Sequence, residues 1–302
     1  MRTDKVNASL QLRLRADVGN SQSDGMSTYP ISNADPDEER RLTLLESLVD
    51  PGTIQRLSNL DVGPGWRCLE VGAGRGSIAK WLCEKVGTTG SVVAVDIDTR
   101  FLDAIAADNL QVLKLDVVDQ PLPSGGFDLI HSRAVLTHLA ARDLVLDKMV
   151  RALRPGGWLL LEKVDGFPLA ASGSEFFIKM MTPMVKDWTW ARKLPSLFVG
   201  HGLRDIGAEV VTKLFNGGSS GAEFWRQRVE GARDRWLRGG ATDESAGDVT
   251  GRDQFVYMAA YGAKLAARNA LSSNARRLGF ASWLLRNPLG RRPIFVRHIP
   301  VT

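Results

Sequence analysis

The chain has 302 residues, of which 44% are hydrophobic and 24% charged, a balance typical of a soluble globular protein with a sizeable core. Its two cysteines, Cys68 and Cys83, do not imply a disulfide framework, and this favours a reducing compartment. Residues 1–25 lack the apolar run of a secretory signal, and no stretch approaches the roughly 18 apolar residues of a membrane span. We therefore expect a cytoplasmic protein without a membrane partner.

The net charge of +5 is unevenly distributed along the chain. Residues 254–302 contain eight Lys or Arg residues and no Asp or Glu, so the rest of the chain is net negative. A basic segment can bind a polyanion, but a solvated surface or a contact with an acidic face of the same protein explains it more simply. Nucleic acid is therefore not the expected partner.

The first part of the sequence predicts an arm followed by helices. Residues 1–27 are polar, with few aromatic or branched side chains, and are predicted to lack fixed structure. A helix signal follows at Asp35, which can act as a cap, and Pro36, which suits the first helical position. A second short helix is predicted from about residue 51 to 60, and residues 28–65 as a whole are expected to cover the binding site.

From residue 66 the pattern changes to short apolar runs joined by helical stretches, which is typical of βαβ crossovers around a parallel sheet. The predicted strands are 67–71, 91–95, 111–115, 127–131 and 158–163, and the predicted helices between them are 77–86, 100–107 and 141–153. Residues 66–165 are therefore the predicted binding core, and the fold class is α/β.

The pattern breaks after residue 165. Residues 166–200 are rich in Phe, Met and Trp, residues 202–215 resemble a helix end plus a strand, and residues 222–237 form an amphipathic helical pattern. A polar linker at 239–251 separates a final segment whose structure the sequence does not predict. We expect residues 166–302 to contain a substrate lid and the remaining sheet and helix elements.

The strongest chemical signal is the run CLEVGAGRGS at residues 68–77, a predicted strand that enters a glycine-rich turn and opens a helix. Glycines let a ligand approach main-chain atoms without a Cβ in the way. The spacing is G-x-G-x-G, whereas the dinucleotide fingerprint has its third glycine where Ser77 stands, and no Walker-type Gly-Lys-Ser/Thr follows. Glu70, two residues before Gly72, adds an acid suited to the amino group of a bound amino-acid moiety.

Two further carboxylates follow predicted strands. Asp96 ends the second strand, where a carboxylate can accept both hydroxyls of a ribose, although NAD enzymes share this arrangement. Asp116 follows the third strand, where a carboxylate can accept from an adenine amino group. Each acid alone can equally be a cap or a loop residue. Together with the glycine turn, they indicate an adenosyl amino acid as the ligand.

These residues resemble the class I S-adenosyl-L-methionine-dependent methyltransferases. The stretches FDLIHSR at 127–133 and ALRPGGWLLLE at 152–162 resemble the fourth-strand and fifth-strand signatures of that family. The resemblance covers about residues 40–165 and points to small-molecule methyltransferases of bacterial secondary metabolism, including enzymes that methylate carbon in indole-type compounds. It implies a Rossmann-like, doubly wound, mostly parallel sheet with N-terminal helices and a helical lid or insertion.

The resemblance also assigns roles to individual positions. The glycine turn and Glu70 match the loop that binds the amino-acid part of the cofactor, and Asp96 and Asp116 match the ribose and adenine contacts. An arginine of the early helix matches a residue that faces the cofactor carboxylate. The expected cofactor contacts are Arg41, Glu70, Gly72, Gly74, Gly76, Asp96, Ile97, Asp116, Val117, Ser132 and Arg133.

Methyl transfer from a sulfonium is an in-line displacement, so the enzyme must align the reactants, exclude water and, for some acceptors, remove a proton. No metal is expected, because no cluster of His, Cys and Asp has the spacing of metal ligands. The candidate bases are Tyr29, His131 and His138. For each histidine, a hydrogen bond to a backbone carbonyl is the simpler interpretation, and Tyr29 can equally be a packing residue.

The aromatic and methionine-rich segment after the fifth strand is the candidate acceptor pocket. Aromatic faces can hold a planar acceptor and tolerate a nearby sulfonium through cation–π attraction, although ordinary core packing explains such a stripe about as well. The expected substrate contacts are Glu162, Asp165, Phe176, Met180, Met184 and Trp188.

The leading hypothesis is methylation of a small, largely apolar aromatic metabolite at carbon, nitrogen or oxygen. The alternative is an RNA or protein methyltransferase that uses the basic C-terminal segment, although residues 130–133 lack the Asn/Asp-Pro-Pro-aromatic sequence of amino-methylating nucleic-acid enzymes of this fold. A non-catalytic cofactor-binding protein is the third class. Whether the early helices pair in a homo-oligomer is left open.

Overall fold

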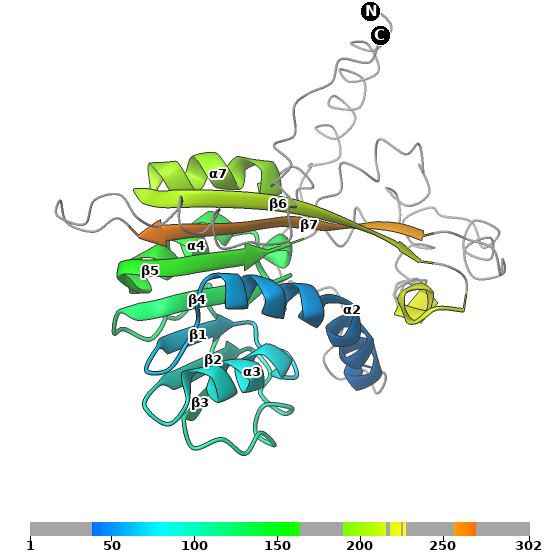
Figure 1. The fold of residues 1–302 in the computed structure, drawn as a ribbon, viewed down its shortest axis with the longest axis horizontal. Coiled ribbons are helices and arrows are strands. Elements are labelled where there is room, and N and C mark those ends of the chain that lie inside the picture. The colour runs from blue at the N-terminus through cyan, green and yellow to red at the C-terminus, as the bar shows by residue number, and fades with distance from the viewer. Residues whose placement is uncertain (1–37, 164–189, 216–217, 225, 228–256, 270–302) are drawn as a thin grey trace, which may run out of the picture.

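The computed structural model describes residues 38–163, 190–215, 218–224, 226–227 and 257–269. A seven-stranded sheet in the order β3-β2-β1-β4-β5-β7-β6 forms its centre, with helices on both faces (Figure 1). The elements are α2 (Glu38–Asn59), β1 (Arg67–Val71), α3 (Ser77–Val86), β2 (Ser91–Asp96), β3 (Leu110–Lys114), β4 (Phe127–Arg133), the 3-10 helix η1 (Leu136–His138), α4 (Arg142–Ala152), β5 (Leu153–Glu162), α7 (Trp190–Gly200), β6 (Leu203–Phe215) and β7 (Tyr257–Asn269).

The first five strands run parallel, and β7 is antiparallel to both of its neighbours, β5 and β6. The chain adds β2 and β3 on one side of β1 and then returns to place β4 on the other side. In open α/β sheets, ligands bind at the carboxyl ends of the strands where the order reverses in this way. The predicted Rossmann-like, mostly parallel α/β fold is confirmed, and the switch point lies between β1 and β4.

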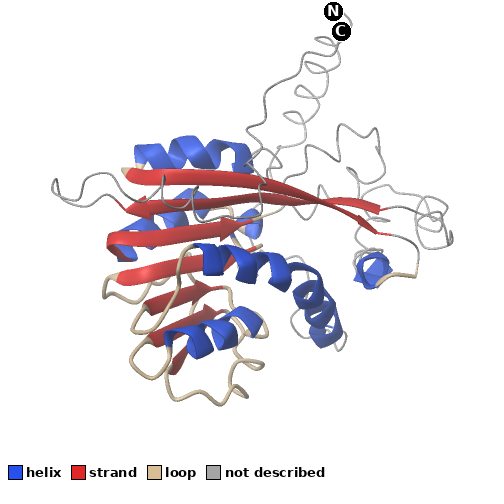
Figure 2. Ribbon diagram, viewed as in Figure 1, coloured by secondary structure: helices blue, strands red, loops and turns tan. Residues whose placement is uncertain are grey.

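Helices lie on both faces of the sheet (Figure 2). Successive residues of the central strands pack into two separate apolar layers beneath them, because side chains alternate between the faces of a sheet. Leu69 and Val71 belong to the layer under α4 and α7, whereas Cys68 and Leu129 belong to the layer under α3 and the end of α2. Burial on both faces explains why these strands read as continuous apolar runs in the sequence.

Helix α2 differs from the prediction of two short helices, since it runs without a break from Glu38 to Asn59 and includes Pro51. Proline lacks an N–H and clashes with the preceding turn, which bends a helix when other contacts hold both halves. Figure 1 shows α2 changing direction partway along its length. Ion pairs hold each half, from Glu46 to Arg75 before the proline and from Arg56 to Glu209 after it.

The predicted helix at 100–107 is wrong, because this segment consists of turns. The reason lies in the two aspartates before it: Asp98 N donates to the Asp96 carboxylate and Arg100 N donates to the Asp98 carboxylate. Such local side-chain bonds compete with the helical hydrogen-bond pattern. β5 also begins five residues before the predicted strand, at Leu153.

In the described part of the chain, no helix is both long and apolar enough to cross a membrane. The final segment, which the sequence left unassigned, contains β7 between β5 and β6. The predicted domain boundaries at 27/28, 65/66 and 165/166 remain predictions.

Gly72 is the tightest point of the fold near the switch point. Its φ of +74° lies in the left-handed region, and an added Cβ would lie 2.0 Å from Val135 Cγ2. Gly202 has a similar φ of +77° but open space around it. A comparison of substitutions at Gly72 and Gly202 therefore distinguishes the cost of backbone strain from the cost of steric overlap.

We predict that Gly72→Ala lowers the free energy of unfolding by roughly 2–4 kcal/mol, because strain and overpacking add. Gly202→Ala should cost only the strain, about 1–2 kcal/mol, and Val135→Ala should recover part of the loss in the Gly72→Ala background. Urea denaturation gives the free energy of unfolding of the wild type, of the two glycine variants and of the double variant. Equal losses for the two glycine variants would show that Val135 does not pack tightly on the glycine turn.

Candidate active site

The glycine turn connects β1 to α3 and is anchored to β2. Gly72 N and Ala73 N both donate to Val95 O, at 2.8 and 3.2 Å. Gly74 has a φ of +58°, and the nearest atom to an added Cβ would be Leu42 Cδ2 of α2, at 3.9 Å. A side chain at Gly74 would therefore make only an ordinary van der Waals contact with α2, and Gly74 itself is partly exposed.

Asp96 joins the end of β2 to this turn. Its Oδ2 accepts from Gly74 N at 2.8 Å, and its Oδ1 accepts from Asp98 N at 3.0 Å. Burial raises the pKa of Asp96, while these amide hydrogen bonds oppose the rise. A carboxylate has about four lone-pair sites, and three backbone amides, those of Gly74, Ile97 and Asp98, bond to this one, so it can still accept from a ligand hydroxyl. Ile97 follows with 40% of its surface exposed, and it offers an apolar face beside the carboxylate.

Asp116 organises the loop after β3. Its Oδ1 accepts from Val118 N at 2.8 Å, and Gln120 Oε1 accepts from Asp116 N at 2.9 Å. Val117, at the centre of this loop, is buried. Asp116 is therefore a loop residue at the carboxyl edge of the sheet, and its contact with adenine stays a prediction.

Lys148 of α4 holds the loop after β3 in place, and the sequence analysis did not identify this residue. Its Nζ donates to Val117 O, Val118 O and Gln120 O, at 2.9, 2.6 and 2.9 Å. Nothing in the sequence marks this lysine, because its partners are backbone carbonyls about 30 positions earlier in a different element.

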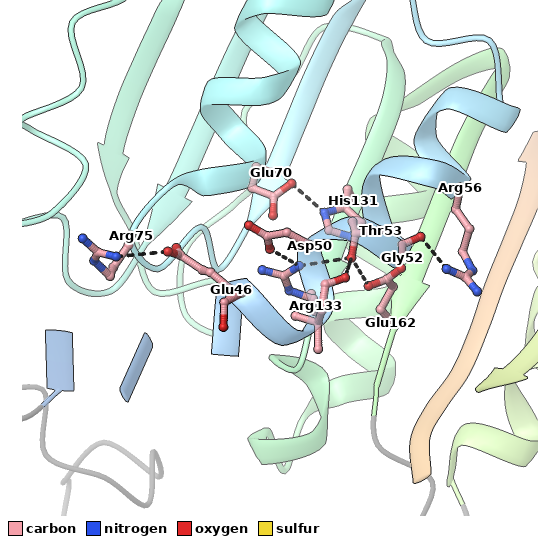
Figure 3. Close-up of polar contacts among 12 residues, drawn as sticks. Glu46, Asp50, Gly52, Thr53, Arg56, Glu70, Arg75, His131, Arg133 and Glu162 are labelled. Atoms are coloured by element: carbon pink, nitrogen blue, oxygen red, sulfur yellow. Dashed lines mark hydrogen bonds and ion pairs between the residues drawn. The ribbon is translucent and has the colours of Figure 1, made fainter. Parts of the chain in front are cut away.

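A row of buried polar side chains crosses the sheet face under α2 (Figure 3). Glu70 and His131 are register partners on β1 and β4, and His131 Nδ1 lies 2.7 Å from Glu70 Oε2. Glu70 is 3% exposed and His131 has no exposed surface. Among the described residues, Nε2 of His131 has no hydrogen-bond partner, a state that costs about 1–3 kcal/mol for a buried polar atom.

The row continues on the next strand pair, where Arg133 of β4 and Glu162 of β5 are register partners. Arg133 Nη1 lies 2.7 Å from Asp50 and donates to Thr53 Oγ1 at 3.1 Å. Thr53 donates to Glu162 Oε2 at 2.6 Å. Helix α2 is therefore bonded directly to both strands.

Sequence reasoning missed Asp50 and Thr53, although a signal was available. Together with Glu46 they are spaced four and three residues apart, which places all three on one face of a helix. A polar face on a leucine-rich helix indicates that this face covers polar groups, and the structure places it over β4 and β5.

Arg75 holds α2 to the glycine turn. Its guanidinium donates to Thr43 Oγ1 at 2.7 Å and pairs with Glu46 at 3.1 Å and with Glu39 at 3.3 Å. Burial raises the pKa of Glu46, and the Arg75 charge opposes the rise. The predicted cofactor contact Arg41 is buried and pairs with Glu38 at 2.5 Å.

The other predicted residues are placed as follows. Ser132 Oγ donates to Val71 O at 2.9 Å and is buried between β1 and β4. His138 ends η1, half-buried, just after β4. The predicted contacts that lie outside the described residues are Tyr29, Asp165, Phe176, Met180, Met184 and Trp188.

The described edge therefore fits an adenosyl amino acid. Gly74 is partly exposed, Asp96 keeps acceptor capacity beside an exposed apolar residue, and the buried row has an unsatisfied nitrogen at His131. Within the described residues, no group of three or more His, Cys, Asp or Glu side chains is arranged to hold a metal ion.

Comparisons with known proteins agree with this geometry. Residues 69–161 match the family model described as a methyltransferase domain. The chain is 33% identical over 120 residues to the ubiquinone/menaquinone biosynthesis C-methyltransferase UbiE of Ectopseudomonas mendocina, covering 36% of this chain and 47% of the relative. It is 31% identical over 112 residues to methyltransferase str3 of Strobilurus tenacellus, covering 36% and 39%. The chain thus spans less than half the length of these two curated relatives.

Among solved structures, a Bacillus halodurans protein described as a candidate methyltransferase superposes with a TM-score of 0.50 at 16% identity, covering 72% of this chain and 98% of that protein. At this identity the likeness shows the fold alone. The predicted resemblance to methyltransferases is confirmed by the family match over residues 69–161 of the sheet core.

We predict that Lys148→Met loosens the 117–120 loop, because three carbonyls lose a charged donor. Since the site is only partly buried and water can replace the amine, the free energy of unfolding should fall by about 1 kcal/mol. Lys80→Met, at an exposed position of α3, is the matched control and should change little. Amide hydrogen exchange of residues 117–120 measures the local effect, and unchanged protection there would contradict the assigned role of Lys148.

Proposed function

We propose that the chain uses S-adenosyl-L-methionine to methylate a small, largely apolar aromatic metabolite. The observation that carries this proposal is the bond from Asp96 to the glycine turn, because it brings a carboxylate suited to ribose hydroxyls and the partly exposed Gly74 to one place at the switch point. Residues 69–161 match a methyltransferase domain in the same region.

When bound, the cofactor supplies an activated methyl group whose carbon–sulfur bond breaks as the bond to the acceptor forms. The chain contributes alignment and exclusion of water. In this proposal Asp96 accepts the ribose hydroxyls, Asp116 accepts from the adenine amino group, and Ile97 and Val117 contact the ring. Arg41 binds the cofactor carboxylate only if that carboxylate replaces Glu38.

Proton removal from the acceptor is assigned to His138 among the described candidates. It ends η1 beside the carboxyl edge and is half-buried, whereas His131 is completely buried. A base must come within hydrogen-bonding reach of the proton that it removes, and a partly exposed position permits this. A carbon acceptor activated by its own hydroxyl group would need less assistance than an alcohol.

The acceptor class is supported by the sequence after β5 and by the named activity of one relative. The aromatic and methionine-rich residues 166–189 follow the carboxyl end of β5, where this fold binds ligands. UbiE is named for C-methylation in quinone biosynthesis. This name favours a ring carbon as the acceptor atom, and it makes quinols candidate acceptors together with indoles and phenols. The names of str3 and str2 from Strobilurus tenacellus record only methyltransferases.

Incubation of the purified protein with the cofactor and panels of indoles, phenols and quinols should yield a product heavier by about 14 Da, the mass that one transferred methyl group adds in place of hydrogen. Mass spectrometry detects it, and a sample with adenosylhomocysteine added as inhibitor is the control. Incubation with cofactor that carries a labelled methyl group, in the presence of RNA or protein fractions, tests the alternative function of an RNA or protein methyltransferase. Labelling of macromolecules alone, with steep salt dependence, would overturn the small-molecule assignment.

We also predict how affinity for adenosylhomocysteine depends on pH. Burial raises the pKa of Asp96, and only the ionised carboxylate has all its acceptor sites. Affinity should therefore weaken as the pH falls through this raised pKa, starting above the usual titration range of aspartate. Asp96→Asn should bind more weakly and without this pH dependence. Parallel calorimetric profiles for both proteins would exclude Asp96 as the titrating group.

A further inference from the structure

The unsatisfied nitrogen of His131 has a defined chemical character. An ionised carboxylate can only accept hydrogen bonds. When Glu70 is ionised, the His131 ring therefore donates Nδ1–H to Glu70 Oε2 at 2.7 Å. In the neutral ring this leaves a lone pair on Nε2. The carboxylate therefore sets the ring to present an acceptor, and the described structure provides no donor for it.

The position of this nitrogen relates it to the glycine turn. His131 stands opposite Glu70 in the β1–β4 register, and Glu70 precedes Gly72 by two residues, or roughly 7 Å along a strand. Helix α2, which covers the ring, also faces Gly74 through Leu42. The acceptor nitrogen and Gly74 thus lie near the same helix and the same strand end.

The charges around the row favour a cationic donor. The carboxylates of Glu46, Asp50 and Glu70 are accompanied by two guanidinium groups, those of Arg75 and Arg133. Glu162, which accepts from Thr53 in the same row, adds a fourth carboxylate. With a neutral His131 ring, this group has a surplus of two negative charges. A buried site of this kind is stabilised by a ligand that brings a positive charge together with N–H donors.

We propose that His131 Nε2 accepts a hydrogen bond from the ammonium group of bound S-adenosylmethionine and that Glu70 is a positioning residue acting through the ring. The inference rests on the proposed function. It replaces the direct contact between Glu70 and the amino group, since one carboxylate oxygen is already committed to His131. Because the ring has no exposed surface, binding must displace atoms that now cover it.

The test compares two ligands that differ only in the amino-acid part. Adenosylhomocysteine has the ammonium group, whereas 5′-methylthioadenosine keeps the adenosine and sulfur without it. In His131→Asn the amide nitrogen takes the place of Nδ1 and keeps the Glu70 partner, but the Nε2 position is empty. We expect this variant to lose roughly 10- to 100-fold in affinity for adenosylhomocysteine, the worth of one charged hydrogen bond, with methylthioadenosine binding unchanged by calorimetry.

His131→Gln is the matched variant, because its amide group reaches the Nε2 position and lacks the Nδ1 donor. It should recover part of the affinity for adenosylhomocysteine. Glu70→Gln, which can still accept from Nδ1–H, should lose less affinity than Glu70→Ala, again only for the ligand with the ammonium group. A merely structural role for either residue would weaken both ligands together, and that result would overturn the proposal.

Wild-type protein provides a readout that does not depend on folding of a variant. In protein labelled with 15N-histidine, the Nε2 signal that is absent from the His131→Gln spectrum should shift with adenosylhomocysteine but not with methylthioadenosine. Equal shifts, or an effect of His131→Asn on turnover alone, would also overturn the proposal. Failure of wild-type protein to bind either ligand would instead reject the proposed function.

Discussion

The carboxylate of Glu70 lies in the middle of a sheet with almost no contact with water, and its neighbours must compensate for that burial. An ionised carboxylate in such a place requires hydrogen-bond donors, and β4 provides the ring of His131. The next strand pair repeats the problem with Arg133 and Glu162, for which Asp50 and Thr53 of α2 supply partners. The polar face of α2 is therefore required by the strands beneath it, and the position of the helix over the switch point follows from this.

Where local patterns and tertiary contacts agree, the sequence predicts the structure closely. β1 and α3 occupy 67–71 and 77–86 as expected, because a buried apolar strand and an amphipathic helix meet at glycines that need a positive φ. Pro51 misled the prediction, since propensity alone ends a helix there while ion pairs on both sides keep it continuous. β7 is rich in alanine, and its strand conformation is set by the strands on either side.

In the candidate site too, some residues could be predicted from local sequence patterns, whereas others depend on tertiary contacts. The glycines, Asp96 and Asp116 were recognisable because they lie at the end of a strand or in the loop that follows it, where position along the chain reports position in space. Lys148 and the partners of Arg133 were not, since they come from other elements and depend on how helices pack on the sheet. The link between Glu70 and His131 requires knowing that β4 lies beside β1, which the spacing of motifs does not reveal.

The sheet order also determines when the sheet can be completed during synthesis of the chain. Among the described strands, β6 lies at the edge of the sheet and pairs with β7, the last described element, which separates it from β5. During synthesis, β1 to β5 can assemble with their helices while β6 has emerged without a strand to pair with. Its unpaired amides and carbonyls then stay open to other chains until residue 269 leaves the ribosome. Nascent chains are therefore most exposed to aggregation between completion of β6 and arrival of β7.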